Sequence, residues 1–491
     1  MRASGILLPI FSLPSPYGIG CFSKEAYDFI DRLNDAGQSY WQILPLGPTG
    51  CGDSPYQALS AFAGSAYYID LEALIQEGKL TEEECAVCHT EDGADTVDYA
   101  KLFDCRQKLL RRAHERSRRS VGFRKFREMN RDWLEDYTLF RALRSAFGDI
   151  SWAEWDRDIK MREPTAMEHW KKKLAEDIQY YAWEQYVFYK QWEKLKRYAR
   201  LRNIKIIGDI PIYVSYDSAD CWAHPKLFML DEDRRPLEVA GCPPDYFCAT
   251  GQLWGNPLYS WNHLKRNAYQ WWIRRLEHSY YMYDVLRIDH FRGFDAYYSI
   301  PFGTETAEEG QWKKGPGLRF FQYMKKALGD RPIIAEDLGA LTDSVRELVN
   351  KAGYPGMKVL QFAFTPGGKS EYLPHRYPEN CVVYTGTHDN DTTKGWYRTL
   401  SLEEKEMVRD YLGREEVAEE TVAWDLIMLA QRSVADLCII PLQDYLNLGS
   451  EARINLPGTV YGNWSWRMDK DALTPKLIER IRRATKLCDR M

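Results

Sequence analysis

Several features that define other protein classes are missing from this 491-residue sequence. No apolar run reaches the ~18 residues that a membrane helix needs. The N-terminal stretch MRASGILLPIFSLP is interrupted by Pro9 and Pro14 and lacks the apolar region and cleavage site of a signal peptide. The net charge is −5, so the overall electrostatics do not favour polyanions. We therefore expect a cytoplasmic protein that binds neither a membrane nor nucleic acid.

The cysteines show no framework of regular spacing. Their number, 11, is odd, so at least one thiol stays unpaired, which is typical of a reducing cytosol. Cys85 and Cys88 are followed by His89 and could suggest a metal site. Because no second CxxC pair occurs elsewhere in the sequence, the metal site is the less favoured interpretation.

Aromatic residues, in contrast, are abundant. They make up 14% of the chain, with 17 Trp and 32 Tyr, and hydrophobic residues reach 45%. A chain of this length and composition can bury a large core. Part of the aromatic content serves such a core, and part suggests surfaces that stack on flat, weakly polar ligands such as sugars.

Short apolar runs that end in polar residues recur along the chain, and helical patterns lie between many of them. The runs are rich in β-branched residues and do not alternate with polar ones, as is typical of fully buried parallel strands. They are GILLPI (5–10), YWQILPL (40–46), IKIIGDI (204–210), DVLRIDH (284–290), RPIIAED (331–337), MKVLQFAF (357–364), CVVYTGTHD (381–389) and DLCIIPLQD (436–444). This pattern predicts an α/β fold, a (β/α)8 TIM barrel. The alternative is a doubly wound open sheet, but no GxGxxG or GxxxxGK[ST] turn follows the first run.

Two intervals are too long for simple connections between strands. Residues 47–203 hold mostly helical patterns and are predicted to form an insertion after the second strand. Residues 211–262 are rich in Pro, Gly and aromatic residues and are predicted to form a loop-rich insertion after the third strand that covers the active site. The whole chain, 1–491, is then one catalytic barrel with inserted subdomains. The basic stretch 108–131 is interpreted as a solvated helical face rather than a nucleic-acid-binding arm.

Carboxylates stand where several of the predicted strands end, which is the face of a barrel that carries the active site. They could bind a divalent metal together with His290 and His388, form structural ion pairs with arginine, or carry out acid–base chemistry on a glycosidic bond. The residues concerned are Asp209, Asp289, Glu336, Asp337, Asp389 and Asp391.

Arg287 and Asp289 are two residues apart, so on a strand their side chains point the same way. A guanidinium beside that carboxylate is expected to lower its pKa and keep it ionised, as a glycosidic nucleophile must be. Retaining chemistry then needs a second, protonated carboxyl about 5–5.5 Å away. The residues alone do not decide between Glu336 and Asp337 for the acid, or between Asp389 and Asp391 for a third carboxylate.

The motifs RIDHFRG, AEDLG and THDNDT, in this order, resemble the three catalytic motifs of the amylomaltase family, the 4-alpha-glucanotransferases of glycoside hydrolase family 77 in the α-amylase clan. The resemblance extends from the first strand to nearly the C-terminus. Further matching stretches are GPTGCGDSPYQ (47–57), GDIPIYV (208–214), PPDYFCATGQLWGNPLY (243–259), PGMKVLQFAF (355–364), GSEARINLPG (449–458) and GNWSWR (462–467).

This resemblance implies a barrel enzyme that needs no cofactor and no metal. It implies Asp289 as nucleophile, Glu336 as general acid/base and Asp389 as transition-state stabiliser. The substrate-binding residues that it implies are Tyr56, Asp209, Trp254, Asn256, Arg287, His290 and His388.

The implied reaction transfers a segment of an α-1,4-glucan donor to the 4-hydroxyl of a glucose or maltooligosaccharide acceptor. A retaining α-glucan hydrolase of the same architecture and a non-catalytic glucan-binding protein remain alternatives. Two positions depart from the family pattern: Cys51, where some relatives carry an aromatic residue, and Cys248, where a serine is usual. Cys51 weakens the expectation of an accessory glucan site there. We expect a monomer or a homodimer.

Overall fold

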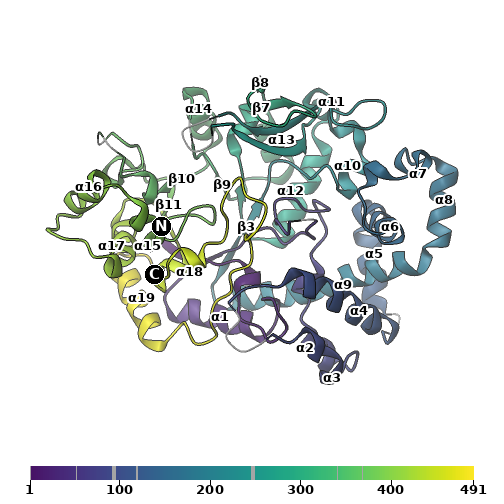
Figure 1. Cartoon of the computed structure of the whole chain (residues 1–491), viewed down its shortest axis with the longest axis horizontal. Coiled ribbons are helices and arrows are strands. Elements are labelled where there is room, and N and C mark those ends of the chain that lie inside the picture. Colours follow the sequence, from purple (N-terminus) through teal and green to yellow (C-terminus); the bar gives the residue numbers. More distant parts are fainter. Residues whose placement is uncertain are drawn as a thin grey trace.

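Parallel strands form the centre of the molecule. The computed structural model describes residues 2–50, 52–90, 95–117, 120–244, 249–339, 341–365, 367 and 369–491. Eight strands close into a barrel in the order β1-β12-β11-β10-β9-β6-β3-β2 (Figure 1). They are β1 (Ala3–Leu7), β2 (Tyr40–Gln42), β3 (Lys205–Ile210), β6 (Val285–Ile288), β9 (Ile333–Ala335), β10 (Gly356–Val359), β11 (Cys381–Tyr384) and β12 (Leu437–Pro441). Each overlaps one of the predicted apolar runs, so the TIM-barrel prediction is confirmed.

Side chains on one face of β3 and β6 form two successive layers along the barrel axis, an apolar layer and then a charged one. Ile207 and Val285 belong to a cluster of buried side chains contributed by the barrel strands. Asp209 and Arg287 lie two residues further along the same strands and therefore on the same face. The register of β3 and β6 also makes Asp209 and Arg287 direct neighbours. The apolar layer is thus followed by a charged layer at the carboxyl ends of the strands.

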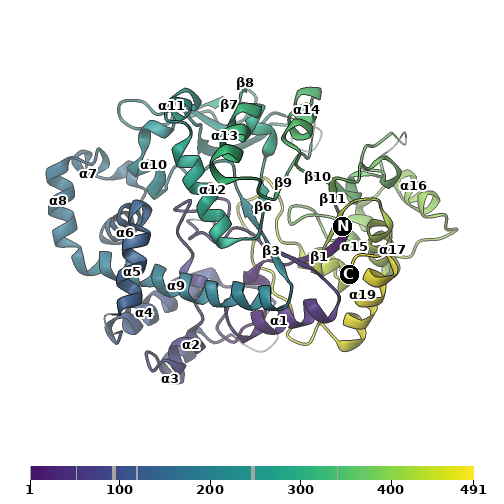
Figure 2. The same cartoon turned by 180° about the vertical axis from the view of Figure 1, so that it is seen from behind.

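Helices surround the barrel and fall into two main groups. Figures 1 and 2 show α4 to α8 on one side of the barrel, and α15 to α17 with α19 on the opposite side. The helices that follow barrel strands or close the chain are α1 (Lys24–Asp35), α12 (Gln270–Met282), α13 (Leu318–Leu328), α14 (Asp343–Ala352), α15 (Thr393–Thr399), α16 (Leu402–Leu412), α17 (Glu419–Arg432), α18 (Leu442–Tyr445) and α19 (Pro475–Leu487). Helices α1 and α14 end before Gly37 and Gly353, whose positive φ values of 69° and 78° suit glycine at a helix end.

The chain between β2 and β3 is mainly helical. Its helices are α2 (Leu71–Gln76), α3 (Glu82–Cys85), α4 (Tyr99–Glu115), α5 (Val121–Met129), α6 (Arg131–Ala146), α7 (Arg157–Lys160), α8 (Pro164–Lys173) and α9 (Ala175–Leu201). Arginines of the basic stretch form ion pairs here, Arg111 with Asp177, and Arg112 and Arg116 with Glu84. Such pairing is typical of a solvated helical face.

The interval between β3 and β6 contains regular structure that the sequence analysis missed. It holds α10 (Ala219–Ala223), β4 (Glu238–Cys242), β5 (Gln252–Pro257) and α11 (Trp261–Arg266). Strands β4 and β5 join β7 (Ala296–Pro301) and β8 (Gln311–Lys314) in an antiparallel sheet of order β5-β4-β7-β8. Because β4 and β5 are short and contain glycine, and because β7 follows only after β6, their pairing was not evident from the local pattern.

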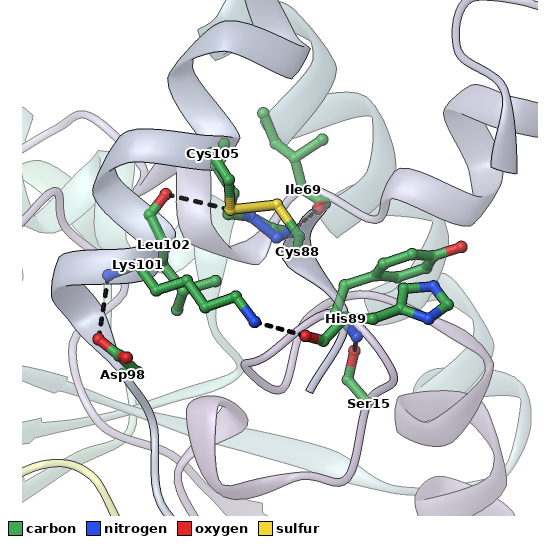
Figure 3. The surroundings of a disulfide bond; sticks show 10 residues. Ser15, Ile69, Cys88, His89, Asp98, Lys101, Leu102 and Cys105 are labelled. Atoms are coloured by element: carbon green, nitrogen blue, oxygen red, sulfur yellow. Dashed lines mark hydrogen bonds between the residues drawn. A yellow bond between two sulfur atoms is a disulfide. The ribbon is translucent and has the colours of Figure 1, made fainter. Parts of the chain in front are cut away.

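A disulfide joins Cys88 to Cys105, 17 residues further along the chain (Figure 3). Cys105 lies on α4, so the bond connects the turn Ala86–Cys88 to that helix. Since the Cys88 sulfur is bonded to another sulfur, it cannot act as the thiolate ligand considered for a metal site with Cys85 and His89. That possibility is therefore wrong, because sequence spacing does not show which sulfurs come within bonding distance. Within the described part of the chain, no helix is long and apolar enough to cross a membrane.

Candidate active site

Arg287 lies at the centre of the charged layer. Its Nη1 donates hydrogen bonds to Asp209 Oδ2 at 2.6 Å and to Asp289 Oδ1 at 3.1 Å. The Arg287 side chain is 3% exposed, whereas that of Asp289 is 27% exposed. The buried guanidinium thus connects the end of β3 with Asp289, and the Asp289 carboxylate stays partly exposed.

Glu336 directly follows β9 and is held by backbone donors. The N–H groups of His290 and Leu338 donate to its Oε2 and Oε1 at 2.7 and 3.0 Å. His290 has a left-handed backbone with φ of 49°, and this turn directs its N–H toward Glu336. The Glu336 carboxyl is therefore placed beside the end of β6, which carries Asp289.

Asp389 is more accessible than Asp289, with 42% of its side chain exposed. Asn455 Nδ2 donates to its Oδ1 at 2.7 Å, and His388 Nε2 lies 3.3 Å from its Oδ2. Arg453 Nη2 donates to its backbone carbonyl at 2.7 Å. A segment near the C-terminus thus fixes the position of a residue that follows β11.

The two competing carboxylates, Asp337 and Asp391, also accept hydrogen bonds from the protein. Asp337 Oδ1 accepts the N–H of Met357 at 2.7 Å. Asp391 accepts the N–H of Thr392 and the hydroxyl of Ser450, both at 2.7 Å. Because Glu336 also accepts two backbone N–H groups, these contacts do not choose between the acids, and the roles of Glu336 and Asp389 stay predictions.

Tyr56 connects Asp209 with His388. Its hydroxyl donates to Asp209 Oδ2 at 2.7 Å and lies 2.9 Å from His388 Nε2, and the two rings stack with centroids 5.3 Å apart. Because the hydroxyl hydrogen goes to Asp209, we assign the His388 tautomer that carries hydrogen on Nε2. Burial lowers the pKa of His388, so the imidazole is neutral and its Nδ1 is an acceptor.

Trp254 and His290 form an aromatic wall. Their rings meet edge to face with centroids 4.8 Å apart. Burial lowers the pKa of His290 to about 3, so this ring is neutral as well. Both polar atoms of Asn256 have protein partners: its Nδ2 donates to the Val214 carbonyl at 3.0 Å and its Oδ1 accepts from Gln57 Nε2 at 3.1 Å. These contacts hold the chain next to Trp254, and the substrate-binding role of Asn256 stays a prediction.

Burial raises the pKa of Asp289 well above the usual aspartate value of 3.8. Arg287 acts in the opposite direction, whereas Asp209, Glu336 and Asp389 raise the pKa further. Arg287 thus lowers the pKa of Asp289 as expected, but burial outweighs this effect and the surrounding carboxylates add to the rise, so the expected net lowering is wrong. Burial likewise raises the pKa of Glu336, opposed by Arg287 and by the two backbone N–H groups. The cluster carries excess negative charge and tends to retain a proton.

Besides Arg287 Nε, three further buried polar atoms at the site have no hydrogen-bond partner among the described residues. They are Asp209 Oδ1, His290 Nε2 and His388 Nδ1. Since buried polar atoms are normally paired, they are candidates for contacts with ligand hydroxyls. The described residues include no group of three or more His, Cys, Asp or Glu side chains arranged to hold a metal ion.

Four residues around the site were not singled out in the sequence. They are Gln57, Arg453, Asn455 and Trp464, and the Trp464 ring lies 5.7 Å from Tyr56 and 6.1 Å from His388. All four belong to stretches that carry the family resemblance. An amide or arginine in a loop gives no sign of its partner, so only this membership could have drawn attention to them.

A family model described as 4-alpha-glucanotransferase, of glycoside hydrolase family 77, matches residues 8–474. The chain belongs to this family. The 4-alpha-glucanotransferase of Clostridium butyricum is 48% identical to this chain over 485 residues. The alignment covers 98% of this chain and 99% of the relative. The 4-alpha-glucanotransferase of Thermus thermophilus is 47% identical to this chain, and the alignment covers 100% of this chain and 99% of the relative.

Among solved structures, the amylomaltase from Streptococcus agalactiae in complex with acarbose matches with a TM-score of 0.96 and 41% identity, covering 100% of both chains. Family membership establishes the chain as a 4-alpha-glucanotransferase enzyme built on a TIM barrel. Cys51 and Cys248, the two departures from the family pattern, lie outside the described residues.

Proposed function

We propose that the enzyme works by a retaining double displacement on α-1,4-glucans. Asp289 attacks the anomeric carbon while Glu336 protonates the departing glycosidic oxygen. The glucosyl–Asp289 ester is then opened by the 4-hydroxyl of an acceptor, whose proton returns to Glu336. The acceptor is glucose or a maltooligosaccharide, and the anomeric configuration of the donor is kept.

The observation that carries this assignment is the contact between Arg287 and Asp289. Asp289 touches the guanidinium directly at 3.1 Å, whereas no hydrogen bond joins Arg287 to Glu336 among the described residues. In the proposed mechanism this direct contact counteracts the burial of Asp289 and keeps it ionised when substrate is bound, and the proton retained by the cluster lies on Glu336, against the two backbone N–H groups that favour ionised Glu336. This distribution is what a nucleophile and a general acid require.

Asp389 is suited to stabilise the transition state. The oxocarbenium-like sugar carries positive charge, and the Asp389 carboxylate is held in place by Asn455 at 2.7 Å. We assign the unpartnered Asp209 Oδ1, His290 Nε2 and His388 Nδ1 to hydroxyls of the sugar at the cleavage point. The S. agalactiae relative binds acarbose, which supports a saccharide in this site.

Transfer rather than hydrolysis requires that an acceptor sugar occupies the site in place of water. The segment 211–262 carries Trp254, which lies against His290 beside the carboxylates. We propose that this segment covers the acceptor side and that the Trp254 ring stacks on the acceptor. Removing the ring should therefore weaken acceptor binding and increase the share of hydrolysis.

The test uses maltotriose and follows both chain lengths and reducing ends. Transfer predicts longer products at a constant number of reducing ends. In Trp254→Ala, reducing ends should accumulate faster relative to transfer, and Asp289→Asn should form no products. An increase in reducing ends without longer chains in the wild type would show a hydrolase instead. Binding of maltotriose without any product would show a glucan-binding protein.

A further inference from the structure

A pocket of about 350 Å³ lies apart from the carboxylate cluster. We call it the α6–α12 pocket, since most of its walls come from the start of α6, from α10 and from α12, which Figure 1 shows on the same side of the molecule. Its volume falls in the range of small-molecule sites. Phe62 and His278 also line a smaller cavity that includes Tyr56 and Asp209. Together with Ser60, which lines both cavities, these side chains form the boundary between the pocket and the cavity that includes Tyr56 and Asp209.

Aromatic side chains form one wall of the α6–α12 pocket. The rings of Trp133 and Phe62 stack with centroids 6.2 Å apart and an angle of 14°, and Trp271 meets Phe62 edge-on at 6.2 Å. Tyr281, one helical turn after His278, is 53% exposed. Trp271 also carries an indole nitrogen without a hydrogen-bond partner among the described residues. Trp271 is buried, whereas Phe62, Trp133 and Tyr281 are at least partly exposed and present flat apolar faces to the pocket.

Polar side chains from α6 and α12 also line the pocket. Asp132 pairs with Arg274 at 3.5 Å, and Asp136 lies 3.8 Å from His224. Glu277 is exposed at the same opening. Carboxylates outnumber cations in this lining, which disfavours anionic ligands such as phosphates. Carboxylates accept hydrogen bonds from hydroxyl groups, whereas the aromatic wall favours the apolar face of a ring.

We propose that the α6–α12 pocket is an accessory binding site for α-1,4-glucan chains. A neutral, polyhydroxylated ring meets both requirements, with one face on the aromatic wall and hydroxyls on the polar side chains. The assignment depends on the substrate class given under the proposed function. Because Phe62 and His278 form part of the boundary between this pocket and the cavity that includes Tyr56, the site holds long glucans without taking part in the chemistry. Polymeric glucans use it, whereas maltotriose is converted without it.

The experiment measures retardation during native electrophoresis in gels that contain amylopectin. It compares the wild type with Tyr281→Ser and with Tyr281→Phe, all in an Asp289→Asn background that prevents turnover. Loss of one stacking ring should raise the dissociation constant for amylopectin about fivefold in Tyr281→Ser. Tyr281→Phe keeps the ring and should bind like the wild type. Tyr323→Ser, which alters a 38% exposed tyrosine on α13, is the matched control and should have no effect.

Equal retardation of Tyr281→Ser and the wild type would overturn the proposal, as would equal loss in Tyr323→Ser. With active enzyme, Tyr281→Ser should convert maltotriose at the wild-type rate, and a matching loss there would also count against a separate site. Failure of the wild type to transfer glucosyl units from maltotriose would contradict the proposed function. Amylopectin binding that depends on Tyr281 would still be measurable in that case, so the two failures are distinguishable.

Discussion

The contact between Asn455 and Asp389 offers a sharp test of the assigned site. Asn455→Ala removes a side-chain N–H that donates to Asp389 Oδ1 at 2.7 Å. The backbone N–H of residue 455, which donates to the His388 carbonyl at 3.1 Å, is kept. The loop therefore retains its backbone attachment, and the substitution isolates one hydrogen bond.

The expected size follows from the charge and exposure of the acceptor. A hydrogen bond to a charged group contributes about 1.5–3 kcal/mol. Because 42% of the Asp389 side chain is exposed, water can replace part of the lost donor, which favours the lower end of that range. At about 1.4 kcal/mol per tenfold change in rate, kcat/KM should fall about tenfold. The loss should lie mainly in kcat, since Asp389 is assigned to the transition state.

The assay is the initial rate of glucose release from maltotriose. Asn463→Ala is the matched control, because Asn463 lies in the same loop, accepts the N–H of Leu456 at 2.9 Å and donates to the Thr459 carbonyl at 3.0 Å. Its kcat/KM should stay near the wild-type value. A change below twofold in Asn455→Ala would refute the reasoning. An equal loss in Asn463→Ala would indicate that loop conformation, rather than this hydrogen bond, matters.

Three further predictions concern the hydroxyl of Tyr56, the acid Glu336 and the buried His278. Tyr56→Phe removes the 2.7 Å hydrogen bond to Asp209 but keeps the stacked ring, so the maltotriose assay should show kcat/KM about fivefold to tenfold lower; unchanged kinetics would contradict its role. Burial raises the pKa of Glu336 above its usual value of 4.5. Because the general acid must be protonated, kcat/KM should fall as the pH rises through this raised pKa. A fall in kcat/KM centred at or below pH 4.5 would argue against Glu336 as the acid. Burial lowers the pKa of His278 to about 4 from 6.5, so unfolded chains bind the proton first, and stability is lost as pH falls between those values. The free energy of unfolding of the wild type, measured in denaturant titrations, should therefore decrease between pH 7 and pH 5. In His278→Gln this decrease should be smaller by about 2 kcal/mol. The same dependence of unfolding free energy on pH in both proteins would contradict the prediction.

The barrel and the location of its acids could be predicted from local patterns. A strand buried on both faces is mostly apolar, so each barrel strand left a short, largely apolar run in the sequence, and charged residues such as Asp209 and Arg287 interrupt it. The polar residues that end these runs lie on one rim because all strands of the barrel are parallel. The two-residue period likewise placed Arg287 and Asp289 on one face, and the structure shows them 3.1 Å apart.

Contacts between distant segments were decided only by the tertiary structure. Asn455 reaches Asp389 across 66 positions of the chain, and Cys105 reaches Cys88 through a turn and a helix. The pKa of Asp289 was likewise decided by the tertiary structure. It depends on burial and on three carboxylates from other strand ends, as well as on its neighbour Arg287. The amino-acid sequence by itself determined which residues lie at the strand ends, because periodicity and apolarity are local. Their partners and their protonation depend on distances in space, which only the closed barrel sets.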